Sequence, residues 1–362
     1  MQTFLRLLFV LFTLITLLTL ASLGAPAFAE EDPVALFDRG QLHRAAAVCE
    51  RRLAAGDDAT AAWVLARIRM DQDRAAEAQK LAETAVRLAP RSADAHETLG
   101  EACGSRAQHA SVFQQPGLAG RCRKEAEAAL QLDPRHVEAH LLLIQFHLAA
   151  PGIMGGDRKK AAALADDLVR IDPARGWIAK ATVARKLDST QVESCYQRGV
   201  EAAPGSARAR IALASWWVTP GHEHFDRAET LANEAVALEP WRTGGWSLLA
   251  GIDAHQSRWT ELDGVLAKAE AQLPDTRLPA YVAARTLINE HREPERAIRL
   301  LRHYLEAEPE IGAPRPAAAH WRIALALEQM GHKDEAVAEL KTAVNLQPDF
   351  QEAKADLKRL SR

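Results

Sequence analysis

The chain has 362 residues, of which 26% are charged, and a formal net charge of −3 at pH 7. Its length allows two domains or one elongated array. The balanced charge provides no basic stripe for a nucleic acid, and four cysteines are too few for a disulfide scaffold of this size. We therefore expect no nucleic-acid partner.

Residues 1–29 are typical of a cleaved secretory signal. Arg6 precedes an apolar run at residues 7–20, which is shorter than the roughly 20 residues that span a membrane. The sequence AFA at 27–29 then resembles a cleavage site. We expect an exported protein, periplasmic or secreted, whose mature chain starts at Glu30. A retained membrane anchor is the alternative.

One spacing of small residues recurs along the rest of the chain. Ala66, Ala78, Ala85 and Pro90 lie 12, 7 and 5 residues apart, and the same spacing returns in the unit that ends at Pro348. Residues seven apart share a helix face, and a proline cannot continue a helix. Each unit is therefore predicted to be two antiparallel helices, which bury their apolar faces only when the units stack.

These units resemble the tetratricopeptide repeat family, most clearly in DAHETLGEAC (94–103) and HWRIALALEQMGHKDEAVAELKTAVNLQPDF (320–350). The resemblance implies an all-α fold, and together with residues 1–29 it indicates an exported, bacterial-type repeat protein. The expected architecture is a right-handed α-solenoid of about nine helical hairpins with a C-terminal capping helix. The predicted divisions are a degenerate first repeat at 30–57, an array at 58–348 and a capping helix at 349–362.

Two insertions interrupt the array, at 104–120 and 151–156. The second, PGIMGG, is followed by Asp157 and resembles a phosphate-binding loop. A phosphate loop of the Walker type requires GxxxxGK and then Ser or Thr after a strand, whereas this stretch follows a predicted helix. We interpret it as a lengthened turn and expect no nucleotide hydrolysis.

The same two turns form a candidate anion-binding edge. Asp157 is a natural helix N-cap, yet basic residues follow it at the positive end of the helix, where anions bind readily. A phosphate or lipid headgroup would fit this edge; the alternative is that the cations are solvated and the loops pack on each other. The candidate edge residues are Arg121, Arg123, Lys124, Ile153, Met154, Gly155, Gly156, Arg158, Lys159 and Lys160.

The resemblance also implies a concave groove, formed by the first helix of each hairpin, in which an extended peptide binds. Apolar anchors beside single polar groups suit this role; a solvated wall without a partner is the alternative. The candidate groove residues are Trp63, Arg67, Met70, Leu141, Gln145, Leu148, Ile211, Ser215, Tyr281, Arg285, Trp321 and Leu325.

Cys103 and Cys122 lie on faces that are expected to meet. In an oxidising compartment they could form a disulfide; buried free thiols are the alternative. No nucleophile motif and no metal-ligand spacing is present, so we expect no enzyme activity, no catalytic residue, no metal and no cofactor.

The sequence therefore predicts a non-enzymatic scaffold of the cell envelope, which binds an unidentified protein or peptide in its groove. The alternative function is binding of a lipid or small apolar ligand in the array, with the loop edge in contact with a membrane headgroup.

Overall fold

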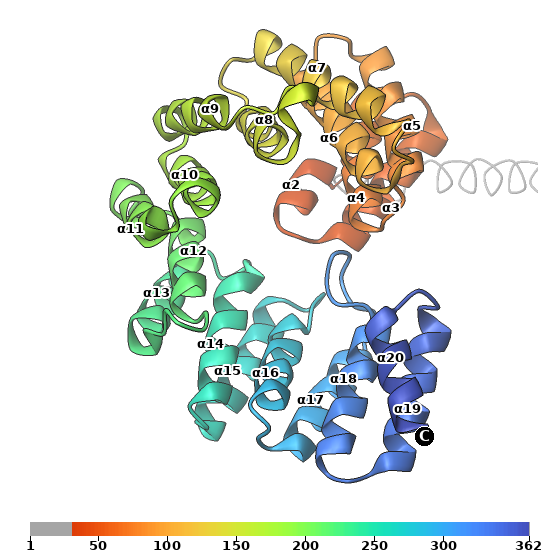
Figure 1. The fold of residues 1–362 in the computed structure, drawn as a ribbon, viewed down its shortest axis with the longest axis vertical. Coiled ribbons are helices and arrows are strands. Elements are labelled where there is room, and N and C mark those ends of the chain that lie inside the picture. The colour runs from red at the N-terminus through yellow and green to blue at the C-terminus, as the bar shows by residue number, and fades with distance from the viewer. Residues whose placement is uncertain (1–30, 362) are drawn as a thin grey trace, which may run out of the picture.

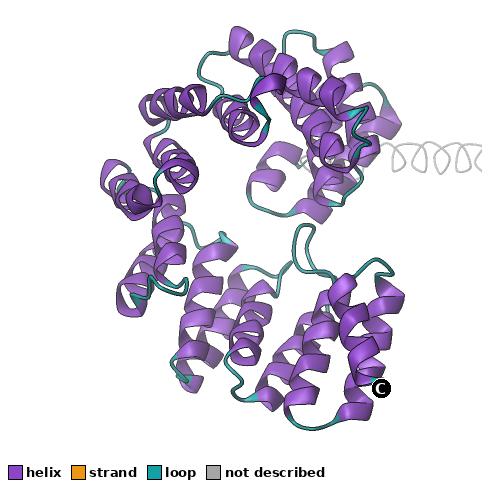
Figure 2. Ribbon diagram, viewed as in Figure 1, coloured by secondary structure: helices purple, strands orange, loops and turns teal. Residues whose placement is uncertain are grey.

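The computed structural model describes residues 31–361, and this part of the chain consists only of helices and loops (Figure 2). It contains 19 α-helices, which follow one another as nine antiparallel hairpins and a single final helix. The predicted all-α solenoid is confirmed.

The first helices of the hairpins are α2 (Pro33–Asp38), α4 (Ala59–Asp71), α6 (Ala93–His109), α8 (Val137–Ala149), α10 (Pro173–Leu187), α12 (Ala207–Trp217), α14 (Thr243–His255), α16 (Leu278–Asn289) and α18 (Pro316–Gln329). The second helices are α3 (Leu42–Ala55), α5 (Ala75–Leu88), α7 (Gln115–Leu132), α9 (Arg158–Ile171), α11 (Val192–Ala202), α13 (Phe225–Leu238), α15 (Trp259–Gln272), α17 (Pro294–Leu305) and α19 (Lys333–Leu346). The array ends with α20 (Gln351–Leu360), and short 3₁₀ helices occur at Gly152–Met154 and Ser189–Gln191.

Local sequence signals set the helix ends. The side chains of Asp58, Ser92 and Ser206 each accept a hydrogen bond from a backbone N–H in the first turn of the helix that follows. Between the two helices of a hairpin the backbone turns through the left-handed region, at Asp73 with φ 59° and at Gly331 with φ 80°. These turns reverse the chain so that the two helices pack antiparallel.

Small residues allow the helices to approach closely, as the repeat spacing predicts. Ala78 and Ala85 have no exposed surface. At the contact between α9 and α10, a Cβ on Gly176 would lie 2.3 Å from the backbone nitrogen of Val169. The core is accordingly divided into a row of hydrophobic clusters along the array.

The segment 104–120 differs from its prediction as a looped insertion. Residues Gly104 to His109 extend α6, and Gln115 to Gly120 begin α7. The extension of α6 contains no proline to stop it, and Pro116 falls in the first turn of α7, where a missing N–H costs nothing. Only the short link between these two helices is non-helical.

The solenoid curves until its two ends meet, so that the molecule is a ring (Figure 1). The loop between α17 and α18 reaches the turn between α2 and α3. There, the N–H of His43 donates to Glu310 Oε1 at 3.0 Å, and His43 Nε2 donates to the carbonyl oxygen of Pro309 at 3.1 Å. Ile311 packs against the N-terminal hydrophobic cluster. We call residues 39–43 and 309–315 the seam.

Candidate interaction surface

The even-numbered helices form the inner layer of the ring from α4 to α18 (Figure 1). Each of these helices contacts the next even-numbered helix, whereas its odd-numbered hairpin partner lies further out. Their inward surfaces form the face that the sequence predicts as a peptide-binding groove.

Helix α2, the first helix of the described residues, covers one end of this face. Trp63 is only 9% exposed and packs in the same cluster as Leu36 of α2. The guanidinium of Arg67 lies 5.4 Å from the centre of the Phe37 ring, also on α2. Of the predicted groove residues, Trp63 and Arg67 are therefore already occupied by an intramolecular partner.

Three carboxyl groups surround Arg67. Its Nη1 atom lies 3.8 Å from Glu97 Oε2, and its Nε atom lies 3.6 Å from Glu101 Oε2. Glu97 is 2% exposed, and burial raises its pKa to about 7 although Arg67 opposes the shift. Burial and the charge of Glu101 also raise the pKa of Asp71. One guanidinium thus faces several acidic groups, and the pKa values of Glu97 and Asp71 are both raised.

A cavity of about 610 Å³ lies beside this group, between α4, α6, α7 and α8. It brings together three of the predicted groove and edge residues, Met70, Gln145 and Met154, with Leu142 and Phe146 in its walls. Met154 comes from the predicted edge and the other two from the predicted groove, so the structure joins parts of two sets that the sequence keeps separate.

Three further groove residues are half-buried in the packing between repeats. Leu141 and Leu148 pack against the hydrophobic cluster around Ile144, and Ile211 fits against Gly244, where an added Cβ would lie 3.1 Å from Ile211 Cγ2. Their main contacts are with neighbouring helices.

Two predicted aromatic anchors are packing residues in the structure. Tyr281 is 4% exposed, its ring lies 5.0 Å from that of Tyr304, and its hydroxyl accepts a hydrogen bond from Arg322 Nε at 2.9 Å. Trp321 donates from Nε1 to Asp356 Oδ2 at 2.9 Å, which ties it to α20. Their assignment as exposed anchors is corrected, because the neighbouring helices bury or bind them.

The side chains of Gln145, Ser215 and Arg285 are exposed on the inner layer, on α8, α12 and α16. Leu325 on α18 is half-buried and lines a hollow with Gln329. The accessible inner face, defined by the first three residues, thus spans the middle of the array and excludes the part covered by α2.

In the second half of the predicted anion-binding edge the helix cap is present, while anion binding there stays a prediction. Asp157 caps α9 and accepts hydrogen bonds from the N–H groups of Lys160 and Lys159, and these bonds lower its pKa. Arg158 and both lysines are exposed, as is Ile153 at 98%.

The other half lies elsewhere. Because α7 begins at Gln115, Arg121, Arg123 and Lys124 are inside a helix and away from its N-terminus. Arg121 pairs with Glu83 at 2.6 Å, and Arg123 lies 3.7 Å from Glu127. The guanidinium of Arg123 also packs against Gly155, where a Cβ would lie 2.5 Å away, and a Cβ on Gly156 would meet the carbonyl oxygen of Ala150. The two turns therefore do not form equivalent anion sites.

Cys103 and Cys122 are free thiols in the structure, buried in one hydrophobic cluster. Burial raises the pKa of Cys103 to about 11 and that of Cys122 to about 12. Their proximity agrees with the predicted meeting of faces, and the disulfide itself stays a prediction.

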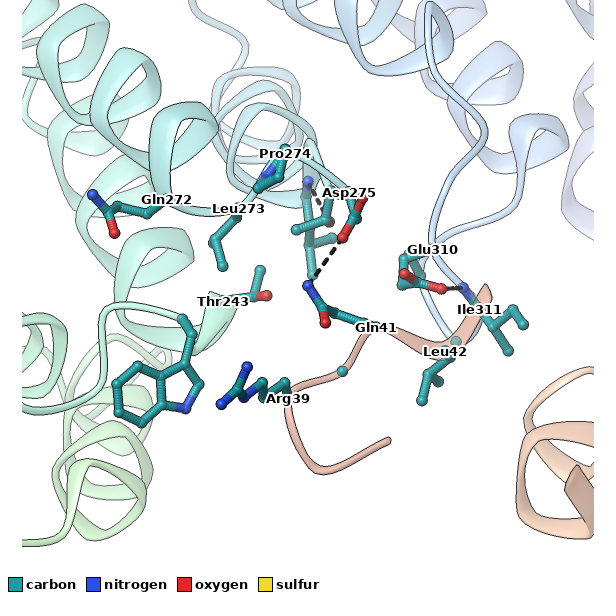
Figure 3. A pocket seen from close by; sticks show the side chains of 16 residues that line it. Arg39, Gln41, Leu42, Thr243, Gln272, Leu273, Pro274, Asp275, Glu310 and Ile311 are labelled. Carbon is teal, nitrogen blue, oxygen red and sulfur yellow. Dashed lines mark hydrogen bonds between the residues drawn. The ribbon is translucent and has the colours of Figure 1, made fainter. Parts of the chain in front are cut away.

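A second cavity, of about 580 Å³, lies at the seam (Figure 3) and is missed by the sequence analysis. It combines Arg39 and Gln41 near the N-terminus with Trp241 and Thr243 of the middle repeats and with Asp275. No sequence pattern signals it, because its walls are more than 200 residues apart and meet only when the ring closes.

In the described residues 31–361, no helix is both long and apolar enough to cross a membrane. The same residues contain no group of three or more His, Cys, Asp or Glu side chains that could hold a metal ion.

An array of stacked hairpins with an accessible inner face defines a helical repeat scaffold. Two family models of the tetratricopeptide repeat match the chain, at residues 64–104 and 317–350. These matches support the tetratricopeptide repeat family in two separate parts of the array. Proteins of this kind generally mediate interactions between proteins.

The chain is also similar to several solved structures. A thermophilic TPR protein of Thermus thermophilus has 22% identity and a TM-score of 0.45, covering 52% of this chain and 98% of its own. Yeast Tom70 has 13% identity and a TM-score of 0.47, covering 91% and 86%. A tetratricopeptide repeat protein of Parabacteroides merdae has 12% identity and a TM-score of 0.45, covering 73% and 99%. No curated protein matches the chain.

Proposed function

We propose that this chain is a non-enzymatic scaffold of the cell envelope that binds an extended segment of another protein along its accessible inner face. The envelope location rests on the sequence of residues 1–29, which lie outside the described residues. Binding on the inner face rests on the structure of the ring.

The accessible inner face carries the proposal. Gln145, Ser215 and Arg285 belong to three helices of one inner layer, and all three side chains remain exposed. The neighbouring side chains of Leu141, Leu148 and Ile211 pack against other helices. Within the described residues, the three polar side chains make no such packing contact that would account for their position. A strip of accessible polar groups beside half-buried apolar ones suits an extended peptide.

Site-specific crosslinking tests this function. A photoreactive amino acid at position 215 or 285, in the full chain expressed in its own cell envelope, is expected to trap one protein partner. Arg87 on α5 and Arg299 on α17 are exposed on outer helices and provide matched control positions. If the outer positions trapped the same protein with the same yield as positions 215 and 285, the inner face would not be the binding surface.

The cavity beside α7 and α8 favours a second candidate function, the binding of a lipid or small apolar ligand. Its walls include Met70, Phe146 and Met154, and the neighbouring side chains of Phe113 and Ile153 are 92% and 98% exposed. Exposed apolar groups near a cavity with both apolar and polar walls suit an amphipathic ligand that enters from a membrane surface. Native mass spectrometry of freshly purified protein distinguishes the two functions, since a co-purifying lipid would support the second.

Fractionation tests the location. The full chain is expected in the envelope fraction, whereas a chain that starts at Glu30 is expected to stay in the cytoplasm. Equal distribution of the two forms would contradict export by residues 1–29.

A further inference from the structure

The inner wall next to the seam carries an unusual row of arginines. Arg175, Arg208 and Arg242 lie at the beginnings of α10, α12 and α14, three consecutive inner helices. A cation is disfavoured at a helix N-terminus because the helix dipole is positive there. Three consecutive cations at this end are therefore costly unless negative charge compensates them.

Carboxylates of the described part of the chain compensate only two of these three cations. Arg175 pairs with Glu138 at 2.6 Å, and Arg242 pairs with Glu239 at 2.5 Å. Arg208 forms no hydrogen bond or ion pair within residues 31–361, and it is exposed. The surrounding protein partly desolvates its guanidinium, and this desolvation, together with the charges of Arg242 and Arg175, lowers its pKa. The positive potential at Arg208 thus remains unbalanced.

The seam adds a second cation. Arg39 ends α2 and lines the seam cavity together with Trp241, which is 46% exposed, and Thr243 (Figure 3). It too has no hydrogen bond or ion pair to any described residue. Burial raises the pKa of its neighbour Asp38, and the charge of Arg208 is close enough to oppose that shift. The two unpaired guanidiniums therefore border one region.

The acidic groups of the cavity are already engaged by the chain itself. Asp275 Oδ2 accepts a hydrogen bond from Gln41 Nε2 at 3.2 Å. Glu310 Oε1 accepts from the backbone N–H groups of His43 and Ile311 at 3.0 and 2.9 Å. Apart from the carboxyl of Asp38, what the wall offers to an incoming group is therefore two free guanidiniums and an indole surface. A guanidinium binds a carboxylate through two parallel hydrogen bonds.

We propose that this part of the inner wall binds an acidic peptide segment, whose side-chain carboxylates contact Arg39 and Arg208 while an apolar residue packs on Trp241. The proposal rests on the proposed function and names the chemistry of the partner. A peptide fits better than a single small anion because the cations are distributed over α2, α10, α12 and α14.

The test uses the full chain and two fluorescein-labelled peptides of one length, in which Glu or Gln alternates with Gly. By fluorescence anisotropy at low salt, the Glu peptide is expected to bind at least about tenfold more tightly than the Gln peptide, since it gains charge-assisted hydrogen bonds. Its affinity is expected to fall as salt is added.

Arg208→Gln and Arg39→Gln are each expected to weaken binding of the Glu peptide about tenfold. Neither arginine has an ion pair to lose, so both variants are expected to keep the helical circular dichroism of the parent. Arg299→Gln removes the same charge from the outer face and is expected to bind like the parent.

Equal binding of the Glu and Gln peptides would overturn the proposal, as would equal affinities for Arg208→Gln and Arg299→Gln. Binding of phosphatidylglycerol vesicles that is tighter than peptide binding and is lost in Arg208→Gln would reassign the site to a lipid headgroup. If position 215 or 285 still crosslinks to a protein, the proposed function holds even when one of these results excludes the acidic-peptide site. The site and the function can therefore be disproved separately.

Discussion

His43 and Glu310 are 267 residues apart in the sequence, and the backbone N–H of the first donates a hydrogen bond of 3.0 Å to the carboxylate of the second. This contact joins the first hairpin to the loop after the eighth, and Arg315 pairs with Asp73 near it. A repeat array normally makes contacts only between neighbouring units. Here a long-range contact fixes the curvature of the whole array.

Glu310→Ala is expected to open the ring. The substitution removes one of the hydrogen bonds that cross the seam and leaves the N–H of His43 unpaired, at a cost of about 1.5 kcal/mol, or roughly a tenfold shift toward open forms. Small-angle X-ray scattering is expected to show a larger radius of gyration, with unchanged helix content by circular dichroism. Glu308→Ala, in the same loop but exposed and outside these contacts, is the control. Identical scattering from both variants would argue against a closed ring held at this seam.

Gly176→Ala is expected to destabilise the protein, by about 3 kcal/mol, because the new Cβ would overlap the backbone of Val169. Gly264→Ala is the matched control. Nothing lies within 4 Å of a Cβ there, so replacing a helical glycine by alanine is expected to stabilise by about 1 kcal/mol. Thermal unfolding followed by circular dichroism compares the two, and a similar midpoint for both variants would contradict the close contact of α9 with α10.

The sequence predicts the hairpins because their determinants are local. Small residues seven apart, such as Ala78 and Ala85, indicate a close contact between helices. A proline such as Pro90 indicates the end of the unit. The helical form of 104–120 escapes prediction for the same reason. The repeat spacing shows only that extra residues are inserted here, whereas α6 runs on to His109 and α7 starts at Gln115 with Pro116 in its first turn.

The site is less predictable because it depends on contacts between distant segments. Helical spacing places Trp63 and Tyr281 on the inner layer, but it contains no information on α2, which covers Trp63, or on Tyr304, which covers Tyr281. Arg39 and Trp241 come together only through closure of the ring. Periodicity therefore indicates which helix layer faces inward, and tertiary packing decides which of its residues stay accessible.

The buried thiols are expected to react slowly in the folded protein. A thiol reagent attacks the thiolate, and burial raises the pKa of Cys103 to about 11 and of Cys49 to about 12. At pH 8 the native rate is expected to be at least about a hundredfold below that of the denatured chain. The same titration tests the predicted disulfide, because a bridge between Cys103 and Cys122 would leave only Cys49 and Cys195 reactive after denaturation without reductant.

Glu97 is expected to make stability depend on pH. Its pKa rises from 4.5 to about 7 on folding, chiefly through burial. The folded chain therefore holds a proton that the unfolded chain has released between these two values. The stability contributed by this carboxyl is complete below pH 4.5 and is lost as pH rises to about 7, by up to about 3 kcal/mol.

Glu97→Gln isolates this effect, since glutamine resembles the protonated acid and does not ionise. The free energy of unfolding of the variant relative to the parent is expected to be near zero at acidic pH and to increase across pH 4.5 to 7. Denaturant titrations at a series of pH values measure the unfolding free energies of variant and parent. Taking the difference at each pH cancels the contribution of the other carboxylates, which both proteins share. Glu201→Gln, exposed on the outer helix α11, controls for the loss of a charge. If the Glu97→Gln and parent profiles ran parallel, folding would leave the pKa of Glu97 unshifted, and Arg67 would compensate its burial fully.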